Sequence, residues 1–127
     1  MDIRCGIDII ELERISRALQ SSNSFKKKVY TEKEQACCEN KGKGMLQSYA
    51  ARFCAKEAVA KALGTGISEG ISFLDIEIVN DDKGKPVVNL SGQALLRYGN
   101  MGARAIDISL THCRDYALAQ AVILIGE

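Results

Sequence analysis

Apolar residues occupy every second position at the start of the chain, at Ile3, Cys5, Ile7 and Ile9. This alternation predicts a strand over residues 2–9, with Asp8 near its C-terminal end and on the face opposite Ile7 and Ile9. The period then changes, because Leu12, Ile15 and Leu19 recur at helical spacing and predict a helix over residues 11–20. A polar break at 21–24 follows, and we expect a short basic helical turn after it.

Two further helices are expected before the middle of the chain. Thr31 and Glu34 have the spacing of a capping box, with Thr31 as the N-cap of a helix that runs toward Glu39. After a glycine-rich loop at 40–44, good helix formers predict a long helix from about Leu46 to Leu63. Gly64 then stands where a left-handed C-cap is expected, and a loop extends over 65–72.

Strand patterns dominate the second half. Residues 75–79 and 86–90 predict a hairpin around a turn at 81–85, with Pro86 at the first position of its strand or on a sheet edge. Ser91 is expected to cap a helix that ends near residues 98–99, and 104–110 with 116–125 predict a second hairpin. We therefore expect an α+β fold in one domain over 1–127, with the helices of the first half packed on a mainly antiparallel sheet.

Composition changes this picture little. The chain has 127 residues, 46% of them hydrophobic and 26% charged. This composition is typical of a globular domain that buries a core without stabilising disulfide bonds or metal ions. The net charge of +1 gives no general reason to expect nucleic-acid binding. Residues 14–31 nevertheless contain no acidic side chain, and they carry the basic residues Arg14, Arg17, Lys26, Lys27 and Lys28. Such a surface attracts an acidic partner or is simply a solvated face.

The cysteines and the lone histidine limit the possible chemistry. The chain has 5 cysteines, an odd number, without C-x-x-C spacing, and its 1 histidine excludes a His-rich zinc site. No signal peptide or long apolar run is present. Free and mostly buried thiols in a reducing cytoplasm fit this pattern best.

Candidate chemistry lies at the end of the long helix. Glu57 and Lys61 are four residues apart and share a helix face, with Phe53 one turn earlier. A carboxylate, an ammonium group and the backbone N–H groups of the turn at 64–66 suit a metal ion and a phosphate. The alternative is a solvated ion pair that contributes about 0.3–0.5 kcal/mol.

Three motifs, in this order along the chain, resemble those of the holo-[acyl-carrier-protein] synthases, the small bacterial class of 4′-phosphopantetheinyl transferases. They are residues 6–15 (GIDIIELERI), residues 52–64 (RFCAKEAVAKALG) and residues 109–112 (SLTH) followed by 116–119 (YALA). The resemblance covers essentially the whole chain. Two positions depart from the family pattern: Cys54 stands where Ser or Ala is common, and Leu110 where Ile is more usual.

The resemblance implies a reaction and its requirements. A member of this family transfers the 4′-phosphopantetheine arm of coenzyme A to a serine of apo acyl carrier protein and releases adenosine 3′,5′-bisphosphate. It needs Mg²⁺ and works as a homotrimer with active sites between subunits. Neither nucleic acid nor a membrane is implied as a partner. The single-domain length favours the carrier of fatty acid synthesis.

The resemblance also assigns roles to residues of this chain. Asp8 and Glu57 would be the metal ligands and would act in catalysis with Lys61. The expected coenzyme A contacts are Arg52, Lys56, Lys61, Gly64, Thr65, Lys85, Pro86 and His112. Arg14 is the first candidate for docking the acidic carrier, followed by Arg17, Lys26 and Lys28.

Other interpretations remain open at this point. Asp8 could be only a helix cap, and His112 or Lys85-Pro86 only turn residues. The protein could be a binding module that uses its basic segment on nucleic acid, although that segment has few aromatic residues and leaves Asp8, Glu57 and Lys61 unexplained. A transferase of the same fold that acts on a polyketide or peptide-synthetase carrier is a third possibility.

Overall fold

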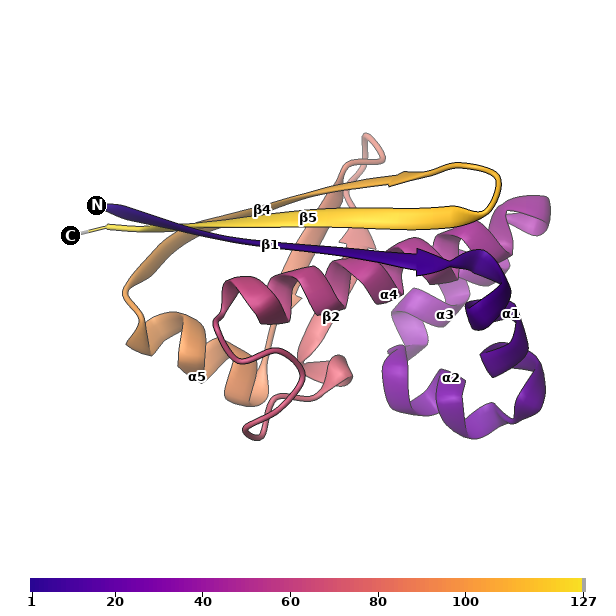
Figure 1. The fold of residues 1–127 in the computed structure, drawn as a ribbon, viewed down its shortest axis with the longest axis horizontal. Helices are drawn as coiled ribbons and strands as arrows, with labels where there is room; N and C mark the ends of the chain where they lie inside the picture. The colour runs from indigo at the N-terminus through magenta and orange to yellow at the C-terminus, as the bar shows by residue number, and fades with distance from the viewer. Residues whose placement is uncertain (127) are drawn as a thin grey trace.

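The computed structural model describes residues 1–126, so Glu127, the last residue of the expected domain, lies outside the described residues. The first half contains β1 (Asp2–Glu11), α1 (Leu12–Ser21), α2 (Asn23–Val29), α3 (Glu32–Glu39), the 3₁₀ turn η1 (Gly42–Gly44) and α4 (Met45–Ala62). The second half contains the 3₁₀ turn η2 (Phe73–Asp75), β2 (Ile76–Asn80), β3 (Pro86–Leu90), α5 (Gly92–Asn100), β4 (Ala103–His112) and β5 (Tyr116–Ile125). The α+β class is confirmed (Figure 1).

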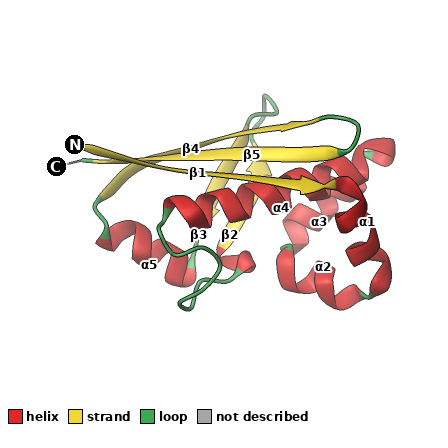
Figure 2. Cartoon of the chain, in the orientation of Figure 1, coloured by secondary structure: helices red, strands yellow, loops and turns green. Residues whose placement is uncertain are grey.

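The strands form two antiparallel sheets. One has the order β1-β5-β4, and the other is the β2-β3 hairpin. Helix α4 runs along one face of the three-stranded sheet and packs mainly against β1 and β5, while α1, α2 and α3 gather at one end (Figure 2). This arrangement makes α4 the central element, because it also contacts α3 and β2 on its other side.

Helix α4 and β1 approach each other unusually closely at Gly6. A Cβ atom at this position would overlap the backbone oxygen of Ala58 and lie 2.8 Å from the nitrogen of Ala62. Small residues on the neighbouring strand continue the contact, since Ala117, Ala119 and Ala121 are completely buried. Only glycine fits under the helix here, and Asp8 follows two residues later on the same face of β1.

The isoleucine side of β1 faces away from α4. Ile3, Ile7 and Ile9 are 62%, 57% and 58% exposed, whereas Gly6 and Ile10 on the other side are buried. The alternation predicted the strand correctly, but the more apolar side of the strand is the uncovered one. Val122 of β5 and Cys5 lie on the same open face, where they are paired in the sheet register.

The predicted elements agree with the structure to within a few residues. The capping box of α3 is present, and Pro86 is the first residue of β3. Strand β1 continues to Glu11, so the following helix begins one residue later than expected. Ser91 precedes α5, but its side chain makes no capping hydrogen bond, which corrects that expectation.

The cysteines are less buried than expected. All five are free, but only Cys38 and Cys54 are buried, while Cys37 is half-buried and Cys5 and Cys113 are exposed. Among residues 1–126, no helix is both long and apolar enough to cross a membrane.

Candidate active site

Asp8, Glu57 and Lys61 come together where the end of β1 meets α4. The Lys61 ammonium nitrogen Nζ donates to the Ile7 carbonyl at 2.9 Å and lies 3.3 Å from Asp8 Oδ1. The Asp8 side chain is 19% exposed and that of Lys61 49%, so the cluster opens to solvent on the Lys61 side. The sequence placed Asp8 at a strand end and Glu57 with Lys61 on one helix face. The fold brings these three side chains together, which the sequence alone could not establish.

The two carboxylates of this cluster repel each other. Partial burial raises the pKa of Glu57, the negative charge of Asp8 raises it further, and only Lys61 opposes the shift. A single ammonium group therefore stands against two carboxylates in a partly desolvated place. Such a surplus of negative charge favours the binding of a cation.

The composition of the cluster fits a magnesium ion better than a transition metal. Mg²⁺ takes oxygen ligands, keeps several waters and is held by one or two carboxylates together with substrate phosphates. Within residues 1–126, no group of three or more His, Cys, Asp or Glu side chains is arranged to hold a metal. Asp8 and Glu57 can therefore supply only part of a coordination shell, as expected for a site completed by water and a phosphorylated ligand.

Cys54 lies beneath the cluster and is inaccessible. Its sulfur contacts the Ala117 carbonyl at 3.4 Å, and the residue is fully buried. Burial, followed by the charge of Asp8, raises the pKa of the Cys54 thiol to about 12. The thiol therefore stays neutral and acts as a small packing residue, like the Ser or Ala expected there.

The turn after α4 has the expected glycine geometry, but its N–H groups are already used. Gly64 and Gly66 have φ angles of 90° and 65°, in the left-handed region. The Gly64 N–H donates to the Lys61 carbonyl, and those of Thr65 and Gly66 donate to Ala60. Gly64 and Thr65 stay predicted phosphate contacts, although the end of the helix already uses their N–H groups in this conformation.

A second candidate region is a basic groove of about 650 Å³ on the other side of α4. Its walls come from the η1 segment, the β2-β3 hairpin and the end of β4. The lining includes Arg52, His112 and Pro86, three of the expected coenzyme A contacts, together with Lys41 and Lys43. We call this the basic groove.

Arg52 is the most informative residue of the basic groove. It is 3% exposed, and its guanidinium donates to the Ile78 carbonyl at 3.1 Å, to Ser48 Oγ at 2.7 Å and to Cys37 Sγ at 3.1 Å. All of these acceptors are neutral, and among the described residues no carboxylate forms an ion pair with Arg52. A nearly buried cation without a counter-charge, on the wall of a groove, indicates an anion site.

Lys41 and Lys43 were missed by the sequence analysis. Residues 40–44 read as a glycine-rich loop, and this loop forms the 3₁₀ turn η1 at the start of α4. The signal was the repeated Lys-Gly pattern, since a glycine beside each lysine lets the backbone turn sharply toward the groove. The sequence alone gave no reason to place this loop beside His112.

Lys85 lies apart from the basic groove. It forms an exposed ion pair with Asp107 at 2.7 Å and lines a separate, largely apolar groove of about 510 Å³ between β3 and β4. His112, the last residue of β4, is exposed and paired with Ala117 in the sheet. Pro86 lines both grooves and thus connects Lys85 to the basic one.

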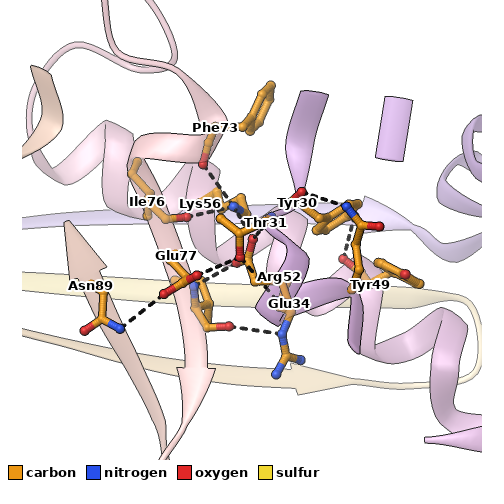
Figure 3. A network of polar contacts seen from close by, with 12 residues as sticks. Tyr30, Thr31, Glu34, Tyr49, Arg52, Lys56, Phe73, Ile76, Glu77 and Asn89 are labelled. Atoms are coloured by element: carbon orange, nitrogen blue, oxygen red, sulfur yellow. Dashed lines mark hydrogen bonds and ion pairs between the residues drawn. The ribbon is translucent and has the colours of Figure 1, made fainter. Parts of the chain in front are cut away.

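Lys56 does not reach either region. Its side chain is completely buried, and Nζ contacts Glu34 Oε1 at 2.7 Å and the carbonyls of Ile76 and Phe73 at 2.7 and 2.9 Å (Figure 3). The three protons of the ammonium group are thereby satisfied inside the core. The expectation that Lys56 binds a phosphate is contradicted by this burial.

Phe53 also belongs to the core rather than to the site. It stacks on Phe73, with 5.4 Å between the ring centroids, and its ring lies 6.2 Å from that of Phe25. This aromatic cluster joins α2, α4 and η2.

The basic segment of α1 and α2 divides into free and paired cations. Arg14 and Arg17 are exposed and share an open hollow with Ala18 and Ser21. Lys28 is also exposed, whereas Lys26 is paired with Glu39 at 3.0 Å and lies over the ring of Tyr49. Arg14, Arg17 and Lys28 therefore remain accessible to an acidic partner, and Lys26 is the least available of the four.

The acidic cluster and the basic groove lie on opposite flanks of α4. Arg52 and Lys61 are nine residues apart, which turns their side chains about 180° from each other around the helix. The sheet order agrees, because Asp8 lies on the edge strand β1 and His112 on the opposite edge strand β4. One copy of the chain therefore does not bring Asp8, Glu57 and Lys61 together with Arg52 and His112.

Comparisons with known proteins identify the class. The family model of the 4′-phosphopantetheinyl transferase superfamily matches residues 4–121. A holo-[acyl-carrier-protein] synthase of Ruminiclostridium cellulolyticum is 50% identical over 100% of this chain and 96% of its own length. A crystal structure of a holo-(acyl-carrier-protein) synthase from Bacillus anthracis, in complex with coenzyme A (3′,5′-ADP), is 39% identical with a TM-score of 0.80, and covers 97% of this chain and 96% of that one.

A third comparison agrees with these two. The Helicobacter pylori holo-[acyl-carrier-protein] synthase, solved in complex with coenzyme A, is 30% identical with a TM-score of 0.82 over 94% of this chain and 99% of that one. The chain belongs to the 4′-phosphopantetheinyl transferase superfamily. Within it, the chain is a transferase of the holo-[acyl-carrier-protein] synthase family.

Proposed function

We propose that the chain transfers the 4′-phosphopantetheine arm in a Mg²⁺-dependent reaction that releases adenosine 3′,5′-bisphosphate, and that Asp8, Glu57 and Lys61 form the reacting centre. The observation that carries this proposal is the partly buried cluster of two carboxylates and one ammonium group.

The reaction requires a simple exchange of bonds. The serine oxygen of the carrier forms a bond to the phosphorus nearest the pantetheine, and the bond from that phosphorus to the bridging oxygen of the pyrophosphate breaks. The electrons of the broken bond leave with adenosine 3′,5′-bisphosphate, and the serine proton must go to a base. Positioning and neutralisation of charge account for most of the catalysis in such transfers.

The residues of the cluster suit these tasks. Mg²⁺, when bound, neutralises pyrophosphate charge and polarises the phosphorus–oxygen bonds. Asp8 and Glu57 would hold it. Because its pKa is raised, Glu57 accepts a proton more readily than an ordinary carboxylate does, directly or through a water molecule. Lys61 can turn from Asp8 toward the departing phosphate, because its ammonium group is half exposed.

The basic groove is proposed to hold the nucleotide end of coenzyme A. Arg52 lacks a counter-charge, and Lys41, Lys43 and His112 add donors for phosphate oxygens beside it. Pro86, on the wall of this groove, and the neighbouring Lys85 are proposed to lie near the adenine. Arg14 and Arg17, with Lys28, are proposed to dock the acidic carrier.

The separation of the two regions supports a homotrimer with active sites between subunits. The acidic cluster of one copy would meet the basic groove of the next. The open face of the three-stranded sheet supports the same proposal, because Ile3, Ile7 and Ile9 are exposed there and isolated chains rarely leave such side chains in water. We further propose that the protein works in the cytoplasm, on the carrier of fatty acid synthesis.

Mass spectrometry tests the reaction directly. Apo acyl carrier protein is incubated with the chain and coenzyme A, with Mg²⁺ or with EDTA, and the small products are analysed in parallel. We expect one phosphopantetheine arm on the carrier and an equal amount of adenosine 3′,5′-bisphosphate, both absent with EDTA. Transfer that persists in EDTA would refute the metal requirement. Transfer only to a polyketide or peptide-synthetase carrier would replace the proposed acceptor.

A further inference from the structure

The proposed reaction does not use the buried ion pair of Glu34 and Lys56. Both side chains are 0% exposed. Glu34 Oε1 accepts from the Thr31 N–H at 2.8 Å as well as from Lys56, and Oε2 accepts from the Ile78 N–H at 2.8 Å. With the two carbonyls bound by Lys56, every strong hydrogen-bonding group of the pair has a partner.

Stability alone is a weak explanation for this arrangement. Replacement of a buried ion pair by well-packed apolar side chains is often neutral or stabilising, because desolvation cancels much of the attraction. Burial indeed lowers the pKa of Lys56, and the charge of Glu34 opposes that shift. What the pair provides beyond stability is a fixed geometry among the elements that it joins.

The pair joins α4 to three other elements. Glu34 lies in the first turn of α3, Lys56 near the C-terminal end of α4, and the bonded backbone groups belong to η2 and β2 (Figure 3). Thr31 extends the connection, because its hydroxyl donates to Glu77 Oε2 at 2.7 Å. The helix is thereby held at one point on the side away from the sheet.

That point is adjacent to the reacting centre in the sequence of α4. Lys56 precedes Glu57, so the two side chains leave the helix about 100° apart. On the sheet side, the backbone of Gly6 lies directly against α4 and allows no gap. The helix is therefore fixed from two sides, and a rotation of α4 about its axis would move Glu57 and Lys61 relative to Asp8.

We propose that Glu34 and Lys56 are positioning residues, whose buried ion pair fixes the rotation of α4 and thereby the placement of Glu57 and Lys61 opposite Asp8. This inference rests on the proposed reacting centre. It assigns no contact with coenzyme A or with the carrier to either residue.

The first test uses the double variant Glu34→Gln/Lys56→Gln. Two amides can keep most of the hydrogen bonds to the backbone but lack the strong attraction of the ion pair. We expect kcat to fall about 10- to 100-fold while the KM for the apo carrier changes less than threefold, because a misplacement near 1 Å affects the reacting atoms most and the carrier is proposed to dock on α1 rather than on α4. Tyr49→Phe is the matched control: it removes a hydrogen bond of α4 to Glu39 at 2.7 Å but leaves the ion pair intact, so kcat should stay at the wild-type value.

Glu34→Asp provides a milder second variant. It keeps the charge but shortens the side chain by one methylene, so a fall in kcat with a cooperative thermal transition is expected even if the double variant unfolds. An unchanged kcat in a folded variant, at a temperature below its Tm, would overturn the positioning role and leave a purely structural one. The wild-type protein in the same assay separates the positioning role from the proposed function. If the wild type itself transfers nothing, the proposed reacting centre is wrong, and the positioning role is refuted together with it.

Discussion

At the scale of single residues, the fold satisfies some charges completely and leaves others unbalanced. Lys56 and Glu34 neutralise each other inside the core, whereas Arg52 has only neutral partners and Glu57 faces a second carboxylate. Arg52 is nearly buried but lines the basic groove, whereas Glu57 lies in the partly exposed acidic cluster, so the unbalanced charges of the two regions differ in sign. A positive groove and a negative cluster are what a ligand with both phosphates and a bound cation requires.

The charge conflict at Glu57 predicts a gain in stability when it is removed. Because the pKa of Glu57 is raised above its ordinary value of 4.5, the folded chain binds this proton more readily than the unfolded chain does. The ionised carboxylate thus lowers the free energy of unfolding above its folded pKa, and the penalty disappears as the pH falls toward 4.5.

We therefore expect Glu57→Gln to raise the Tm at pH 7, by an amount that shrinks at lower pH, and to abolish transfer. Thermal unfolding from pH 4.5 to 8, with the exposed Glu69→Gln as control, checks the first part. A Tm below that of the wild type at pH 7 would show that the carboxylate is not under repulsion.

At the scale of elements, the position of α4 decides the site. The helix lies between the β1 backbone on one side and α3 with β2 on the other, and Glu57 and Lys61, the proposed reacting side chains, project from the flank between these contacts. The close approach at Gly6 brings Asp8 into range of Lys61, so a strand residue without a side chain contributes to the geometry of the site.

Gly6→Ala should therefore damage both fold and activity. The added methyl overlaps backbone atoms of α4, which cannot move independently, so we expect a loss of about 1–3 kcal/mol in the free energy of unfolding. Gly99→Ala in α5 is the control, because its methyl meets nothing within 4 Å and a helical alanine should stabilise by about 0.5–1 kcal/mol. Denaturant titration measures both, and a Gly6→Ala variant as stable as the wild type would refute the tight contact.

Helix α1 supplies a second prediction at this scale. It buries Leu12 and Ile15 and leaves Arg14 and Arg17 on its outer face. Arg14→Ala should raise the KM for apo carrier roughly tenfold at low salt with little change in kcat, because rim charges act mainly on association. Lys33→Ala, an exposed basic residue on α3, should leave the KM unchanged. A KM that does not respond to salt would contradict electrostatic docking.

The sequence predicted the elements better than their faces. Periodicity found β1, the run of good helix formers found α4, and the Thr31–Glu34 spacing found the cap of α3, since these signals are local. The ion pair of Glu34 with Lys56 could not be predicted, because the two residues are distant in the chain. Helical spacing does not show which face of α3 or α4 packs against which other element. Lys56 was misassigned because a resemblance in sequence does not show which side chains the fold buries. Lys41 and Lys43 were overlooked because their groove forms only when β4 and the β2-β3 hairpin come together.

At the scale of the whole molecule, the arrangement is incomplete in a single copy. The acidic cluster and the basic groove lie at opposite sheet edges, and the sheet face with Ile3, Ile7 and Ile9 is uncovered. Both features have one explanation if copies pack through this face.

Val122→Asp tests that explanation. It places a charge at the middle of the open face, so we expect monomers in analytical ultracentrifugation and loss of transfer, while the circular dichroism of the monomer stays that of a folded chain. Ser24→Asp, which adds the same charge on α2, should leave the assembly unchanged. Assembled and active Val122→Asp would remove the open face from the interface.

The uneven exposure of the cysteines gives the molecule its own reporter of assembly. Cys113, in the turn between β4 and β5, and Cys5, opposite Val122 on the open face, are accessible in the isolated chain, whereas Cys38 and Cys54 are not. A thiol reagent should therefore label Cys113 at any protein concentration but Cys5 only when subunits separate. The ratio of the two labels would then record, without any engineered probe, the fraction of chains that stand alone.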